Sequence, residues 1–173
     1  MSMSVGCSCL YPVTQMAVSR YIVNCMACVA PKAPAAALIE KEISSDENEV
    51  KRISRDPRIY HGQVMNRTAA EVLKLTDIAA KELLTLKVPF LALHGGDDKI
   101  CYAEGSRRLF EQSATDPSKK SLVLLPGCRH EIFHEAAPAA KDNTQLVVEY
   151  FDSQLLTHPA GGADMREVEL KST

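Results

Sequence analysis

This sequence has no surplus of basic charge, no long apolar segment and no regular cysteine spacing. Its 20 lysine and arginine residues are matched by 22 aspartate and glutamate residues, which argues against a nucleic-acid partner because no basic excess remains to neutralise phosphates. The mainly apolar stretch 16–29 contains Arg20 and Asn24 and is shorter than the roughly 20 residues that a membrane-spanning helix needs. The six cysteines have no framework spacing, so we expect free thiols in a reducing compartment.

The composition is otherwise that of an ordinary soluble domain, and residues 88–135 hold its most informative pattern. A length of 173 residues with 46% apolar and 24% charged residues is enough for one domain with a real core. The apolar runs 88–93 and 122–125 are typical of buried parallel strands, with a helix predicted between them over 103–114.

An acid follows the first of these strands and a histidine follows the second. A glycine turn after residue 93 leads to Asp98, and the second strand stops at Pro126-Gly127 before His130. Open α/β sheets place their chemistry at the carboxyl ends of the strands, so we expect the acid and the histidine at one edge. Acid before histidine along the chain is the order of the α/β-hydrolases, in which a serine nucleophile precedes both.

The residues of these two turns match one enzyme family. The matching stretches are Val88-Pro89-Phe90-Leu91-x-Leu93-His94-Gly95-x-x-Asp98-Lys99-Ile100-Cys101 and Gly127-x-x-His130-x-x-x-His134. They closely resemble monoacylglycerol lipases of the serine aminopeptidase S33 type, and their plant lysophospholipase-like and caffeoylshikimate-esterase-like relatives. The resemblance covers roughly residues 56–155. It implies that Asp98 is the triad acid and His130 the triad base, that the substrate is a lipid-like ester, and that no metal or organic cofactor is used.

The nucleophile of that family is missing from the sequence. Its serine lies on a G-x-S-x-G turn between a strand and a helix, and no such motif occurs here. The nearest string, Gly6-Cys7-Ser8-Cys9-Leu10, ends in leucine and has no room for a strand before it. The upstream oxyanion loop of the family is absent as well. The sequence therefore resembles the C-terminal portion of a serine hydrolase with two of its three triad residues.

The expected fold is a partial α/β-hydrolase: a helical cap segment, then the last two parallel strands with flanking helices. We expect a cap-like segment over residues 1–62, the C-terminal part of the core over 63–157 and a disordered tail over 158–173. In the family the cap covers the acyl pocket and contacts lipid, so we expect a cytoplasmic protein that touches membranes peripherally through this segment.

Further helices are predicted from capping signals and apolar periodicity. Ser44-x-x-Glu47 and Thr68-x-x-Glu71 read as capping boxes for helices over 46–53 and from residue 68. The helix from residue 68 and a last helix near the C-terminus should each bury one apolar face. These faces are Val72, Leu75, Ala79, Leu83 and Leu86, and Leu146, Val147, Tyr150, Phe151 and Leu155.

Two other functions stay open. The string His130-Glu131-Ile132-Phe133-His134 satisfies the H-E-x-x-H zinc-protease signature, which needs a continuous helix. Pro126-Gly127 before it and Pro138 after it leave about two turns, so we rank the zinc reading below the hydrolase. The second alternative is a truncated or inactive relative of the enzymes, with a binding role.

Overall fold

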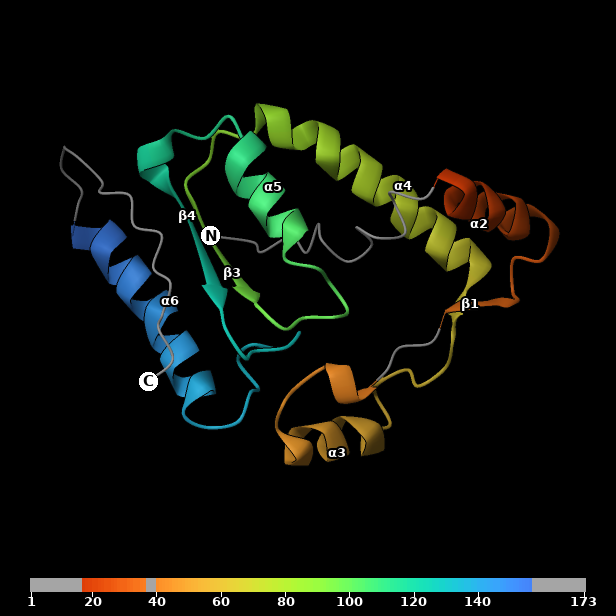
Figure 1. Cartoon of the computed structure of the whole chain (residues 1–173), viewed down its shortest axis with the longest axis horizontal. Helices are drawn as coiled ribbons and strands as arrows, with labels where there is room; N and C mark the ends of the chain where they lie inside the picture. The colour runs from red at the N-terminus through yellow and green to blue at the C-terminus, as the bar shows by residue number, and fades with distance from the viewer. Residues whose placement is uncertain (1–16, 37–39, 157–173) are drawn as a thin grey trace.

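The computed structural model describes residues 17–36 and 40–156, and Figure 1 shows how they are arranged. None of the helices within these ranges is both long and apolar enough to cross a bilayer. The expected tail 158–173 lies outside the described residues. In chain order the elements are α2 (Ala17–Val29), β1 (Pro34–Ala36), the 3₁₀ turn η1 (Glu40–Glu42), α3 (Glu47–Arg55), β2 (Val64–Met65), α4 (Asn66–Glu82), the 3₁₀ turn η2 (Leu83–Thr85), β3 (Phe90–Gly95), α5 (Glu104–Gln112), the 3₁₀ turn η3 (Pro117–Lys119), β4 (Lys120–Leu125) and α6 (Ala139–Leu156).

The two predicted strands are present and lie side by side in parallel. Their register runs from Phe90 opposite Lys120 to Gly95 opposite Leu125. The helix between them makes the crossover that a parallel pair requires. Because both strands run in the same direction, the residues that follow Gly95 and Leu125 emerge at one edge of the sheet (Figure 1).

The two faces of this sheet are covered by different helices. On one face the buried Val123 and Leu125 pack with Leu146 of α6. On the other face His94 makes a hydrogen bond to Ser106 of α5. The sheet is thus the middle of three layers, with α5 and α6 on opposite sides (Figure 1). Burying a strand on both faces requires a nearly continuous apolar run, as the sequence has here.

The N-terminal part extends away from the sheet as a two-helix arm. α2 packs along α4, and the guanidinium of Arg20 forms an ion pair with Asp77. β1 and β2 pair in antiparallel fashion next to the start of α4, a pairing that the sequence does not signal. Nδ2 of the buried Asn66 donates to the carbonyl of Ala30 at 3.0 Å, which ties the start of α4 to the end of α2.

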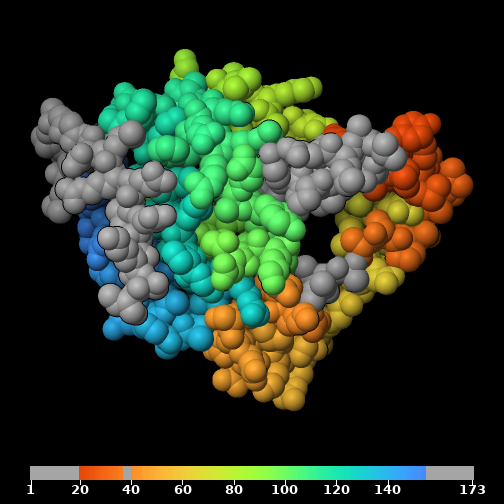
Figure 2. All heavy atoms as spheres, in the orientation of Figure 1, coloured from red at the N-terminus to blue at the C-terminus, as the bar shows by residue number. Residues whose placement is uncertain are grey.

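A second N-terminal piece, η1 with α3, returns to the C-terminal half. Figure 2 shows its orange atoms in contact with the cyan and blue atoms of later residues. The expected helix is present as α3, but its cap is Asp46, which accepts from the N–H of Asn48 at 2.8 Å. The prediction of a capping box at Ser44 is therefore wrong. The Ser44 hydroxyl donates instead to the carbonyl of His134 at 2.6 Å, a partner distant in sequence.

Two further sequence expectations need correction. α4 begins at Asn66 with no side-chain cap, so Thr68 lies inside the helix and does not cap it. The buried residues of α4 include Ala70 and Leu73, whereas Leu75 is 63% exposed. α4 contacts α2 and does not lie on the β3–β4 sheet. The face of α4 that is buried by this contact differs from the face that apolar content alone indicated.

Candidate active site

Asp98 lies in the turn after β3, and the backbone of that turn holds its side chain. Oδ1 accepts hydrogen bonds from the backbone N–H groups of Ile100 and Cys101, both at 2.8 Å. Aspartate often bonds the backbone two residues further on, which makes such a turn locally stable. The side chain of Asp98 is only 3% exposed, so these bonds satisfy a carboxylate that has little access to water.

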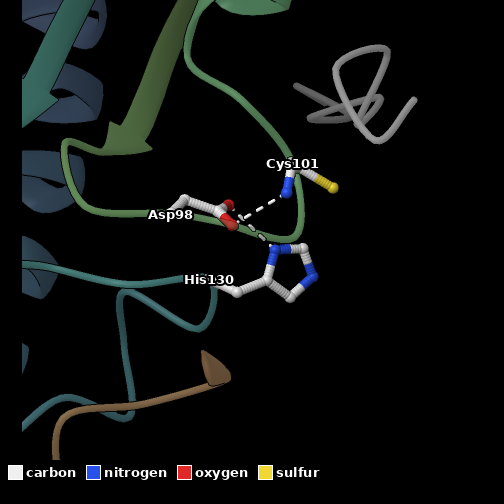
Figure 3. Close-up of side chains that lie close together, drawn as sticks. All are labelled: Asp98, Cys101 and His130. Carbon is white, nitrogen blue, oxygen red and sulfur yellow. Dashed lines mark hydrogen bonds and ion pairs between the residues drawn. The ribbon is translucent and has the colours of Figure 1, made fainter. Parts of the chain in front are cut away.

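The second oxygen of this carboxylate faces His130, which the loop after β4 carries to the same edge. Nδ1 of His130 lies 2.9 Å from Oδ2 of Asp98, across 32 residues of sequence. An ionised carboxylate only accepts, so Nδ1 carries the proton and Nε2 is the basic nitrogen. Figure 3 shows Nε2 on the side of the ring away from Asp98. The expected approach of these two side chains is confirmed, and it presents a neutral imidazole base at the edge.

The pairing shifts the ionisation of both groups. Burial works most strongly on the pKa of Asp98 and would raise it, but hydrogen bonds from His130, Cys101 and Ile100 together hold this pKa below its usual value. The hydrogen bond to Asp98 raises the pKa of His130, partly opposed by burial and supported by the charges of Asp98 and Glu131. The site therefore favours an anionic acid beside a histidine that readily takes up a proton.

Backbone hydrogen bonds join the two turns that carry this pair. The N–H of Gly96 donates to the carbonyl of Leu125 at 2.8 Å, and the N–H of Asp97 donates to the carbonyl of Cys128 at 2.9 Å. The other acid of this turn, Asp97, is exposed and is the alternative candidate for the triad acid. These bonds extend the strand register past the ends of β3 and β4, so the separation of the acid and the histidine is fixed by the backbone.

His94 of β3 was not predicted as a site residue, and its hydrogen bonds support the Asp98 turn. Its Nε2 donates to the carbonyl of Cys101 at 2.6 Å, and its Nδ1 accepts from the hydroxyl of Ser106 at 2.8 Å. Nε2 also lies 3.5 Å from Oδ2 of Asp98. A histidine near the end of a buried strand, four residues before an acid, is the sequence signal that could have pointed to this role.

The H-E-x-x-H string does not form the helix that a zinc protease needs. Residues 130–138 fold as turns, and α6 begins only at Ala139. Nδ1 of His134 bonds Oε2 of Glu131 at 2.8 Å, whereas His130 bonds Asp98. The two histidines thus belong to separate clusters. The proline on each side of the string explains why the helix does not form.

Two groups of described side chains have donor atoms close enough together for a metal ion. They are Asp98, Cys101 and His130, and Glu49, Glu131 and His134. In the first group Cys101 is disulfide-bonded, so its sulfur is not a thiolate ligand. In the second, both oxygens of Glu49 accept from the guanidinium of Arg52, at 2.8 and 2.5 Å. Neither donor set fits a resident zinc ion.

The disulfide also corrects the expectation that all the cysteines are free thiols. Of the described cysteines, Cys25, Cys28 and Cys128 are free. Spacing along the chain does not show which cysteines meet in space, so the sequence could not reveal the bond at Cys101.

With this geometry in place, comparison with known proteins identifies the family. Residues 5–137 match the family model Hydrolase_4, described as serine aminopeptidase, S33. The chain belongs to this family. It is 28% identical over 130 residues to a monoacylglycerol lipase of Mycolicibacterium smegmatis, covering 75% of this chain and 44% of that protein. It is 26% identical over 110 residues to a monoglyceride lipase of Rattus norvegicus, covering 64% of this chain and 35% of that protein.

Solved structures agree on the fold. The monoacylglycerol lipase of Paleococcus ferrophilus superimposes with a TM-score of 0.68 at 27% identity, over 79% of this chain and 52% of that one. A soluble variant of the Saccharomyces cerevisiae monoglyceride lipase, solved with a substrate analogue, gives a TM-score of 0.66 at 20% identity, over 82% and 51%. The chain spans about half the length of these relatives or less, and it has part of the α/β-hydrolase fold, as expected.

Proposed function

We propose that this chain supplies the acid and the general base of a serine ester hydrolase. The nucleophilic serine and the oxyanion-hole donors come from residues outside these 173. The observation that carries the proposal is the hydrogen bond of 2.9 Å between His130 and the buried Asp98. Family membership adds a second, independent support.

In this proposal His130 moves the protons of both half-reactions. Nε2 takes the proton of the serine hydroxyl as the serine oxygen attacks the ester carbonyl, and then gives it to the departing alcohol. In the second half-reaction Nε2 takes a proton from the water that attacks the acyl-enzyme, and then returns it to the serine oxygen as the carboxylic acid leaves. Asp98 keeps the proton on Nδ1 and stabilises the imidazolium that forms twice in each cycle.

The proposed substrate is a lipid-like ester, either a monoacylglycerol or a lysophospholipid. The support is that the relatives at 26–28% identity are named as monoacylglycerol and monoglyceride lipases. A phenolic ester is the competing substrate class. The two classes are separated by comparing hydrolysis of a long-chain monoacylglycerol with that of a caffeoyl ester by the same preparation.

We further propose that the protein contacts membranes peripherally through α2. Tyr21, Ile22 and Val29 of this helix are 72%, 52% and 78% exposed. An amphipathic helix with such side chains can lie in the headgroup region of a bilayer. Sedimentation with neutral vesicles, compared between the wild type and an Ile22→Ser, Val29→Ser variant, tests this contact.

The test of the catalytic proposal restores the missing half. The 173-residue chain is fused behind an N-terminal hydrolase segment that contains G-x-S-x-G, and the product is assayed with a serine-directed fluorophosphonate and with monoacylglycerol. We expect labelling and turnover that are lost in His130→Gln and kept in the matched control His134→Gln. If the fusion is folded and turns over substrate equally in both variants, His130 is not the base.

A binding role without catalysis is the second candidate, and the absence of G-x-S-x-G favours it for the chain taken alone. In that case the unfused chain binds monoacylglycerol without hydrolysing it. The same fluorophosphonate applied to the unfused chain separates the alternatives. Strong labelling would reveal a nucleophile within the 173 residues, with Ser8 the first residue to substitute.

A further inference from the structure

A second buried carboxylate lies behind the histidine of the site. Glu135 is 4% exposed, although it belongs to a loop. Its Oε1 accepts from the backbone N–H of Arg129, the residue before His130. Its Oε2 accepts from the backbone N–H of Ser45 at 2.7 Å and from the Ser45 hydroxyl. One carboxylate therefore bonds to two chain segments, at Ser45 and at Arg129, that are distant in sequence.

These two segments are also bonded to each other directly. We call residues 41–46 the stem segment and residues 126–137 the His130 loop. The N–H of Glu131 donates to the carbonyl of Ile43 at 2.8 Å, and the hydroxyl of Ser44 donates to the carbonyl of His134 at 2.6 Å. The guanidinium of Arg129 donates to the carbonyl of Ser44 at 2.9 Å. The stem segment thus holds the His130 loop on both sides of the histidine.

Glu135 suits this role because a carboxylate can accept several hydrogen bonds and donate none. Two backbone donors and one hydroxyl converge on it, and a hydrogen bond to a charged group is stronger than one between neutral groups. A glutamine in its place would direct an NH₂ group toward at least one of these donors. The negative charge of Glu135 is thus matched to its surroundings.

We propose that Glu135 is a positioning residue, which ties the stem segment to the His130 loop and so holds the imidazole of His130 on Asp98. Its relevance to catalysis rests on the proposed function. The coupling itself needs no nucleophile or substrate, because it concerns only groups within this chain. Glu135 makes no hydrogen bond to Asp98 or His130, and it acts through the backbone at Arg129.

The experiment measures the His130 ring in the full 173-residue chain. NMR titration of the five histidines, with His130→Gln to assign the signal, gives the pKa of His130 in the wild type, Glu135→Gln, Ser45→Ala and the control Glu149→Gln. Glu149 is an exposed glutamate of α6 that bonds Gln145, so its substitution removes the same charge without touching either segment. The groups that set the pKa of His130, Asp98 and Glu131, are kept in all of these variants.

We expect the pKa of His130 to fall toward that of an unpaired histidine in Glu135→Gln, to fall less in Ser45→Ala, and to stay unchanged in Glu149→Gln. Amide exchange at Glu131 should accelerate about tenfold in Glu135→Gln and about fivefold in Ser45→Ala, as the loop opens locally more often. Ser45→Ala changes no charge, so a fall there cannot be a direct electrostatic effect.

A Glu135 with only a structural role would lower the unfolding midpoint and leave the His130 titration of the folded protein unchanged. That result in both variants would overturn the proposal. If Glu135→Gln does not fold, Ser45→Ala alone decides the question. Absence of ester hydrolysis in the fused protein bears on the proposed function and leaves this measurement unaffected.

Discussion

The backbone at Gly95 lies directly against the carbonyl oxygen of Arg129. A β-carbon at position 95 would come within 2.0 Å of that oxygen and 2.5 Å of the carbonyl oxygen of Cys128. Both obstacles are backbone atoms of the loop that carries His130, so they cannot rotate away. We expect Gly95→Ala to destabilise the chain by about 3 kcal/mol, the upper end for an overpacked site, and to weaken the pairing of His130 with Asp98.

Gly127→Ala is the matched control for this prediction. Gly127 has a φ of 77°, but a β-carbon there meets nothing within 4 Å. The substitution should cost about 1 kcal/mol from backbone strain alone and leave the His130 ring in place. Urea unfolding and the His130 NMR signal check both variants. Equal effects of the two substitutions on the His130 signal would contradict the role given to Gly95.

The sheet and the acid–histidine pair were predictable because each depends on local sequence. Two apolar runs of strand length with a helix between them have few arrangements other than a right-handed parallel crossover. That arrangement brings residues just after the two strands to one edge, so Asp98 and His130 meet. The actual strands, Phe90–Gly95 and Lys120–Leu125, are displaced by up to two residues from the predicted ends, which alters none of this.

The features that were not predicted depend on partners distant in sequence. Ser44 reads as a helix cap because caps are local patterns, yet its hydroxyl bonds His134. Leu75 reads as buried because it is apolar, yet α4 turns another face toward α2. Glu135 resembles any loop glutamate, and only the folded stem segment explains its burial. The domain boundary after residue 62 and the catalytic roles of Asp98 and His130 stay predictions.

Asp98 and its neighbour Asp97 provide a matched pair for testing the acid. In the fused enzyme, Asp98→Asn should lower kcat by about 10⁴-fold. The asparagine carbonyl would accept from the N–H groups of Ile100 and Cys101, so its NH₂ group would face His130 and donate to Nδ1. The imidazole proton would then lie on Nε2, and this nitrogen could no longer accept the proton of serine. Asp97→Asn changes an exposed residue and should alter kcat by no more than about twofold. Steady-state hydrolysis of monoacylglycerol measures both.

If Asp97→Asn lowers kcat more than Asp98→Asn does, the assignment of Asp98 as the acid is wrong. A result in which both variants keep full activity would remove the triad hypothesis altogether. Because the two substitutions make the same chemical change one residue apart, differences in expression or surface charge do not explain a large gap between them.

The paired groups also predict how activity depends on pH. His130 acts as a base only when neutral, and its pKa is raised by Asp98. The acidic limb of kcat/KM in the fused enzyme should therefore have its midpoint above the ordinary histidine value of about 6.5. A midpoint at or below that value would show that the pair does not form in solution.

Folding stability should follow the same pair with a defined sign. The pKa of His130 is raised in the folded state, so this group adds to the free energy of unfolding. Its contribution is fully present below about pH 6.5 and is lost as pH rises through the folded pKa. The lowered pKa of Asp98 gives stability that is present above about pH 3.9 and is lost as pH falls through the folded pKa. Urea unfolding of the unfused chain and of His130→Gln should therefore differ most between about pH 4 and 6.5.

His94 is expected to stabilise the acid turn through one buried and one partly buried hydrogen bond. His94→Leu removes the donor to the Cys101 carbonyl, which costs about 1–3 kcal/mol in a buried site, and the acceptor for the Ser106 hydroxyl, which costs less because that bond is only partly buried. We therefore expect a loss of about 2–4 kcal/mol in unfolding free energy, with His94→Gln less affected because its amide can still donate to Cys101. The control is His61→Leu: the bonds of this exposed histidine to Glu40 and to the carbonyl of Asp56 are open to water, so its loss should change stability much less. In the fused enzyme His94→Leu should also lower kcat, because Cys101 supplies one of the N–H groups that hold Asp98. Equal losses of stability in His94→Leu and His61→Leu would show that the two hydrogen bonds of His94 contribute nothing specific to this turn.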